Sequence, residues 1–303
     1  MFNEEYSYQD IKDYLCDKID LLITGATNAE ERNHYFYDEW KSIGKDILSL
    51  SYEGDGLVLC NYMCNGSEKN YQVELCVGLP RFLKDLNISN KNILMDLSGL
   101  SHVLIMFLTK QLLKYLSPQL LFAAYIRPQS YLAESDDIGY QLSQRIGAVS
   151  AVPGFSKRES DKQTLCAFLG FEGVRLKGVL ETVNTFERLI PIVAFPSGTP
   201  HWYNVTMLNS MNILQSEGKN LSVYKCYSES IFEAVELLEK IISTDENVVL
   251  APLGTRPHSM ACAIYACRNS SARIVYDFVT ESDHRAIGIS DIKIYHLSSY
   301  IQN

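Results

Sequence analysis

The chain has 303 residues, 47% of them hydrophobic and 21% charged, and a formal net charge of −9. This composition is that of an ordinary globular protein with room for two domains. The negative charge argues against broad binding of nucleic acid, although a local basic pocket for a small anion would survive it. No apolar run reaches the ~18 residues of a membrane helix, and the acidic start MFNEEYSYQD is unlike a signal peptide. We therefore expect a cytoplasmic protein with no membrane partner.

The eight cysteines include no Cys-x-x-Cys pair, and several lie in apolar runs. We expect them to be reduced and structural, because cytosolic disulfides are rare. Cys262 and Cys267 are five positions apart on a predicted helix and do not share a face well. The sequence therefore predicts no metal site, and it indicates no cofactor.

In the first half of the chain, short apolar runs alternate with segments of helical periodicity. Glycines, asparagines and short polar stretches separate them, and residues 64–71 are predicted to be a loop. The predicted strands cover residues 19–24, 47–52, 57–62, 93–97 and 120–126, and the predicted helices cover residues 1–18, about 28–43, a segment around 81–86 and about 102–115.

The second half repeats this pattern. Predicted strands cover residues 164–169, 189–195, 221–227 and 248–251, and predicted helices follow at about 173–186, 203–215, 231–242 and from 257 or 258 onward. When KNILMDLSGLSHVLIMF is laid on ENVVLAPLGTRPHSMACA, Gly99 falls opposite Gly254. Both halves also close on a similar segment, at residues 145–152 and 285–292. This self-similarity favours an internal duplication.

Strands that alternate with helices require right-handed crossovers and a parallel sheet. The predicted fold class is therefore α/β, with two tandem Rossmann-like three-layer units that have mainly parallel sheets and are related by duplication. We place the units at residues 1–158 and 159–303.

Ligands of such sheets bind beyond the carboxyl ends of the strands, where the loops after neighbouring strands face each other. Candidate ligand-binding residues follow from this rule in both halves. They are Gly25, Thr27, Ser98, Gly99 and Ser101 in the first half, and Gly170, Glu172, Arg175, Gly254, Thr255, Arg256 and His258 in the second.

The loop from Pro252 to Pro257, which joins a predicted strand to a helix, is the best equipped of these. Backbone N–H groups at a helix start are unpaired, and a glycine lets a ligand approach them. Arg256 adds a planar guanidinium suited to phosphate or carboxylate. An anion site is the functional interpretation; the alternative is that Gly254 and the prolines only turn the chain and Arg256 is solvated.

Charged residues also follow the first strand of each half: Glu172 and Arg175 in one, and Glu30 or Glu31 with Arg32 in the other. An ion pair at the helix start is one interpretation. The other is a pocket wall whose carboxylate contacts a ribose hydroxyl or a base edge.

Asp96 follows a buried strand, where an ionised carboxylate needs partners, and its counterpart in the second half is Ala251. His102 is a weaker candidate beside it. His258 is either a hydrogen-bonding residue or a proton donor. Short catalytic signatures such as Gly-x-Ser-x-Gly, the Walker A motif, His-Glu-x-x-His and a complete Gly-x-Gly-x-x-Gly are absent, which disfavours hydrolase, NTPase and dehydrogenase functions.

Leu253-Gly254-Thr255-Arg256 resembles the Gly-Gly-Thr-Lys type loop that follows the fourth strand in CARF and SAVED sensors of prokaryotic antiviral systems. Here Arg replaces Lys and Leu replaces the first Gly, and Ser98-Gly99-Leu100-Ser101 lacks the Thr-Lys. The resemblance implies paired Rossmann-like units that bind a cyclic oligonucleotide. No nuclease, protease or membrane effector is recognisable, so a sensor of this kind would act on a separate effector protein.

The leading hypothesis is therefore a binding subunit for a phosphate-bearing nucleotide or cyclic oligonucleotide. One alternative is an enzyme of nucleotide metabolism, of glycosidase or phosphodiesterase type, with Glu172 as base or nucleophile and His258 as acid. Another is a ligand-free scaffold or antitoxin-like subunit, in which the loops only turn the chain.

Overall fold

The computed structural model describes residues 5–25, 32–33, 39–132, 139–140, 142–157, 162–218, 221–243, 246–282 and 285–301. The chain forms two compact units, unit 1 (residues 1–130 and 283–303) and unit 2 (residues 131–282). This division differs from the predicted boundary at residues 158 and 159. The segment before residue 158 contributes strands to unit 2, and the C-terminal segment returns to pair with a strand of unit 1.

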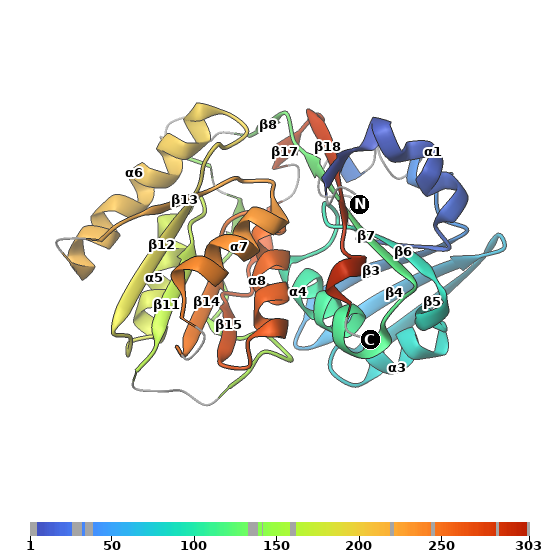
Figure 1. The fold of residues 1–303 in the computed structure, drawn as a ribbon, viewed down its shortest axis with the longest axis horizontal. Coiled ribbons are helices and arrows are strands. Elements are labelled where there is room, and N and C mark those ends of the chain that lie inside the picture. Colours follow the sequence, from blue (N-terminus) through green and yellow to red (C-terminus); the bar gives the residue numbers. More distant parts are fainter. Residues whose placement is uncertain are drawn as a thin grey trace. The chain divides into compact units, whose positions relative to one another are not determined.

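Unit 1 is built on an eight-stranded mixed sheet with the order β1-β18-β7-β6-β2-β3-β4-β5 (Figure 1). Its strands are β1 (Glu5–Ser7), β2 (Leu21–Gly25), β3 (Asp46–Gly54), β4 (Leu57–Cys64), β5 (Ser67–Glu74), β6 (Asn92–Asp96), β7 (Leu120–Arg127) and β18 (Asp291–His296). β2 pairs in parallel with β3 and β6, and β6 pairs in parallel with β7. The other strands add antiparallel edges. The prediction of a mainly parallel sheet is wrong for this unit.

The hairpin of β4 and β5 replaces the loop predicted at residues 64–71. Asn65 and Gly66 form its two-residue turn with φ of 50° and 74°. Positive φ at both positions matches the right-handed twist of the flanking strands. β5 is exposed along most of its length, so it has no apolar run to reveal it in the sequence.

The described helices of unit 1 are α1 (Tyr8–Lys18), α3 (Gly78–Asp85) and α4 (His102–Gln111), which continues into a π-helical turn, η2 (Leu112–Leu116); the 3₁₀ turns are η1 (Ile88–Asn90) and η3 (Ser298–Tyr300). Leu15 and Ile19, at the end of α1, pack with Leu22, Leu94 and Ile294 of the sheet. Most of the helix predicted at about 28–43 lies outside the described residues.

Unit 2 contains a six-stranded sheet with the order β10-β15-β14-β11-β12-β13 (Figure 1). These strands are β10 (Ser150–Ala151), β11 (Thr164–Phe168), β12 (Arg188–Ala194), β13 (Tyr224–Cys226), β14 (Val248–Pro252) and β15 (Ala272–Tyr276). All neighbours are parallel except the short edge strand β10. Counted from β11, the parallel strands follow the order 3-2-1-4-5 of dinucleotide-binding folds. The switch point, where the strand order reverses, lies between β11 and β14.

Helices cover both faces of this sheet: α5 (Gly173–Thr182), α6 (Pro200–Glu217), α7 (Ile231–Ile241) and α8 (Arg256–Arg268). Leu165 and Ala167 of β11 pack with buried residues of α5 and α6. Phe168 points to the other face, where its ring lies 4.8 Å from that of His258 on α8. The alternation along β11 thus gives unit 2 the predicted three layers.

The described residues also form two two-stranded sheets: β9 (Ser143–Arg145) pairs with β16 (Thr280–Glu281) in antiparallel fashion, and β8 (Ser130–Tyr131) pairs with β17 (Ala286–Ile287). All eight cysteines are free thiols, and Cys60, Cys166, Cys226 and Cys262 are buried. Within the described residues, no helix is both long enough and apolar enough to span a membrane.

Candidate functional site

The loops after β11 and β14 lie against each other at the switch point of unit 2. A β-carbon on Gly170 would stand 2.3 Å from Leu253 O, and one on Gly254 would stand 3.0 Å from Leu169 O. The two loops therefore meet where the fold rule places them. However, the glycines are needed because one main chain packs on another, and not because they leave room for a ligand.

Unit 1 has the same arrangement after β2 and β6. A β-carbon on Gly25 would stand 1.6 Å from Gly99 O, so no side chain fits at position 25. Thr27, predicted to line this place, lies outside the described residues. Gly25 and Gly99 thus act as a pair that brings two strand ends together.

The polar side chains at the ends of β2 and β6 in unit 1 form hydrogen bonds within the unit. Asp96 is buried and accepts hydrogen bonds from Thr24 Oγ1 (3.1 Å) and Ser98 N (2.9 Å). Burial raises the pKa of the Asp96 carboxyl. Ser98 Oγ accepts a bond from Ile126 N at 2.8 Å, and Ser101 caps α4 by accepting from Leu104 N. His102, at the start of α4, is 7% exposed.

In unit 2, α8 begins at Arg256, with Pro257 in its first turn and Thr255 as its N-cap. Thr255 Oγ1 accepts a bond from His258 N (3.4 Å) and donates to Ser228 O (2.7 Å). It thereby ties the helix start to the loop between β13 and α7. Proline at such a position is favourable, because its missing N–H would be unpaired in any case.

Arg256 is buried rather than solvated. Its Nη2 lies 2.9 Å from Glu281 Oε2, and the two side chains are 6% and 20% exposed. Arg256 therefore provides positive charge at the helix start, and Glu281 of β16 is its counter-ion.

His258 is enclosed between α8 and the end of β11, with 1% of its surface exposed. Its Nε2 lies 3.0 Å from Tyr227 O. Burial lowers the pKa of its imidazole to about 4. The ring is therefore neutral near pH 7, which disfavours the role of general acid that the enzyme hypothesis requires.

Glu172 and Arg175 belong to a buried network at the start of α5. Arg175 Nε and Nη2 donate to Asp277 at 2.6 and 2.8 Å, a bidentate pair, and its Nη1 lies 3.9 Å from Glu172. Glu172 accepts from Ser143 N (3.0 Å) and Ser143 Oγ (2.7 Å). The network joins α5 to the segments after β15 and at β9, and both predicted residues have their partners inside the unit.

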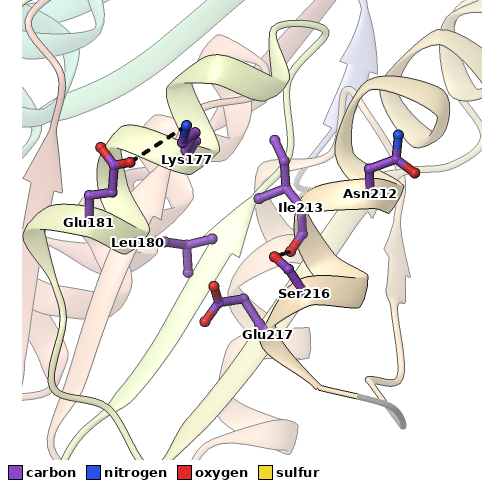
Figure 2. Close-up of a pocket in the computed structure, with 7 residues that line it drawn as sticks. All are labelled: Lys177, Leu180, Glu181, Asn212, Ile213, Ser216 and Glu217. Atoms are coloured by element: carbon purple, nitrogen blue, oxygen red, sulfur yellow. Dashed lines mark hydrogen bonds and ion pairs between the residues drawn. The ribbon is translucent and has the colours of Figure 1, made fainter.

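One pocket, of about 370 Å³, lies between α5 and α6 (Figure 2). Lys177 and Glu181 form an ion pair of 3.7 Å on one wall. The lining consists of Lys177, Leu180, Glu181, Asn212, Ile213, Ser216 and Glu217. None of the residues predicted from sequence lines it.

Sequence reasoning missed four residues that contact the predicted site residues of unit 2, namely Ser143, Ser228, Asp277 and Glu281. Asp277 could have been found, because it is the first polar residue after the apolar run of β15, the same signal that singled out Asp96. Ser228 and Glu281 carry no such signal. Among the described residues, no group of three or more His, Cys, Asp or Glu side chains is placed to hold a metal ion.

No protein-family model matches the chain, and no curated protein matches it.

Proposed function

We propose that the chain is a cytoplasmic binding protein for a phosphate-bearing, nucleotide-like ligand and that it signals to a separate effector protein, as the resemblance to CARF and SAVED sensors of antiviral defence implies. The ligand binds at the carboxyl edge of the unit 2 sheet, at the start of α8. The observation that carries this proposal is the buried Arg256–Glu281 pair at the first residue of that helix.

The Arg256 guanidinium makes the start of α8 an anion site. The Glu281 carboxylate occupies this site in the structure, and a ligand anion replaces it on binding. Arg256 is almost fully enclosed, and a buried guanidinium without a counter-charge costs about 3–5 kcal/mol. A carboxylate or another anion must therefore stay beside it. A phosphate offers more charge than Glu281 and can also accept from backbone N–H groups at the helix start. We expect the phosphate to take the place of the Glu281 carboxylate.

We also propose that the two units arose by duplication and that only unit 2 binds the ligand. The strand order β7-β6-β2-β3 in unit 1 matches β15-β14-β11-β12 in unit 2, and both have loop glycines in close contact at the same place. Ser101 and His102 stand where unit 2 has Arg256, so no arginine or lysine lies at the start of α4. The asymmetry supports one phosphate site per chain.

The test is thermal unfolding of the full chain with nucleotides and cyclic oligonucleotides. At a hundred times Kd a ligand adds about 2.7 kcal/mol of stability, and each kcal/mol raises the Tm by about 2–4 °C for a unit of this size. Arg256→Ala should abolish this rise. Glu281→Gln should lower the ligand concentration needed, because the internal competitor has lost its charge.

Arg268→Ala is the matched control. Arg268 ends the same helix and forms an exposed pair with Glu239 at 3.0 Å, so its loss should leave ligand stabilisation unchanged. The proposal fails if no phosphate-bearing ligand raises the Tm, or if the rise persists in full in Arg256→Ala.

A further inference from the structure

Two buried polar side-chain atoms beside the start of α8 have no hydrogen-bond partner within the described part of the chain. They are Ser228 Oγ and His258 Nδ1, in residues that are 5% and 1% exposed. Buried polar groups in proteins nearly always have a partner, and leaving one unpaired costs about 1–3 kcal/mol. Two such atoms in adjoining segments point to a group supplied from outside the chain.

The chemistry of that group follows from the tautomer of His258. Its Nε2 faces Tyr227 O at 3.0 Å, and a backbone carbonyl can only accept. Nε2 therefore carries the proton, and in the neutral ring Nδ1 presents a lone pair. Nδ1 needs a partner that donates a hydrogen bond. A fully ionised phosphate cannot do so.

The hydrogen-bond partner of His258 Nδ1 is a different group from the phosphate that Arg256 binds, because the two side chains point in different directions. Residues two apart on a helix do not share a face, so Arg256 and His258 serve different parts of a ligand. Tyr227 and Ser228 lie in the loop between β13 and α7, which Thr255 Oγ1 ties to the start of α8. Nδ1 lies 3.4 Å from the position of a β-carbon on Gly254, so it faces the loop after β14.

We propose that Ser228 and His258 form a site for a ribose hydroxyl, which donates to His258 Nδ1 and accepts from the Ser228 hydroxyl. This inference rests on the proposed nucleotide-binding function. A nucleotide carries neutral donor hydroxyls close to its phosphate, which matches a donor site beside a cationic one. Because both atoms are enclosed, binding includes a local opening beside the start of α8.

The test is nitrogen NMR of the full chain labelled with ¹⁵N-histidine, with the His258 signals assigned by their loss in His258→Gln. The probes are the four ribonucleoside 5′-monophosphates, their 2′,3′-dideoxy counterparts and inorganic phosphate. We expect the Nε2–H tautomer in the free protein. The Nδ1 resonance should move in the direction of hydrogen-bond acceptance with a ribonucleotide, but not with its dideoxy counterpart or with phosphate.

Ser228→Ala is the second test. Its Oγ has no hydrogen-bond partner among the described residues, so the variant should be at least as stable as the parent. Loss of one hydrogen bond of ~1.4 kcal/mol should weaken ribonucleotide binding about tenfold, and dideoxynucleotide binding should not change.

The outcomes separate the two proposals. If ribonucleotides and dideoxynucleotides bind equally and Nδ1 does not move, the hydroxyl site is overturned and the phosphate site stands. If Nδ1 already accepts a hydrogen bond without nucleotide, its partner is an ordered water only, and the hydroxyl site is likewise overturned. If no phosphate-bearing ligand binds, both proposals fail.

Discussion

The buried imidazole of His258 makes the stability of the protein depend on pH. Its pKa of about 4 in the folded chain lies below the 6.5 of an exposed histidine. As the pH falls below 6.5, His258 binds a proton in the unfolded chain but not in the folded chain. The free energy of unfolding therefore decreases between pH 6.5 and about 4. At ~1.4 kcal/mol per pKa unit, the loss amounts to about 3 kcal/mol.

Urea unfolding at pH 7 and at pH 4.5 measures this loss. His258→Gln should reduce the difference between the two pH values by most of it, because glutamine does not titrate. His201→Gln, at an exposed histidine on α6, is the control and should behave as the parent. An unchanged pH dependence in His258→Gln would contradict the assignment.

Gly170 is required by the contact between two loops, and we predict that Gly170→Ala destabilises the protein. Its β-carbon would stand 2.3 Å from Leu253 O, and relieving such an overlap costs about 3 kcal/mol. Gly178→Ala on α5 is the matched control. There the nearest described atom to the new β-carbon is Val149 Cγ2 at 3.8 Å, and alanine in a helix is more favourable than glycine by about 1 kcal/mol. Denaturant midpoints that shift in the same direction for both variants would refute the explanation.

At the residue scale, the sequence predicted the positions of the glycines and of the cation but not their environment. Gly170 and Gly254 can be located because turns after strands favour glycine. What packs on them depends on a contact over more than eighty residues. Glu281 lies in a two-residue strand without an apolar pattern, so no local signal marks it as the counter-ion of Arg256.

At the scale of elements, the Arg175–Asp277 pair fastens α5 to the end of β15. Asp277 is fully buried, so Asp277→Ala leaves the guanidinium without its main partner and should cost about 3–5 kcal/mol. Replacing both residues, Arg175→Met with Asp277→Leu, should cost less than the single change, because neither the Arg175 guanidinium nor the Asp277 carboxylate is then left buried without the other.

The exposed pair on the same helix provides the control. Lys177 and Glu181 are 64% and 67% exposed, so Glu181→Ala should change the free energy of unfolding by less than about 1 kcal/mol. Equal losses in Asp277→Ala and Glu181→Ala would show that burial does not set the strength of the Arg175 pair.

Local patterns predicted the central parallel strands well, because strands buried on both faces are continuous apolar runs. β2, β6, β11 and β14 all belong to this class. β5 does not, because solvent covers most of it, and its only signal was Asn65–Gly66 at the turn. That dipeptide between two strands is a strong hairpin indicator and could have corrected the prediction.

At the scale of the whole molecule, the repeat predicted two units but placed their boundary too late. The segment at 285–292 resembles the one at 145–152, and this likeness suggested that each closes its own half. β18 instead pairs with β7 along six residues and also with β1, so the last strand belongs to unit 1. Pairing between strands that lie far apart in the sequence produces no periodic pattern, so the position of β18 in the sheet could not be predicted from the sequence.

Because the C-terminal segment belongs to unit 1, we predict that removal of residues 283–303 unfolds unit 1 and leaves unit 2 folded. Ile294 and Tyr295 of β18 and the following Leu297 are fully buried, and β7 would lose its antiparallel neighbour. Hydrogen exchange should show lost amide protection in β2, β6 and β7 of a chain ending at Ser282. Protection in β11 and β14 should remain, because all strands paired with them lie within residues 131–282. A chain ending at Tyr300, which keeps β18, should exchange like the full protein. Protection of β7 in the shorter chain would instead mean that β18 is dispensable to the sheet.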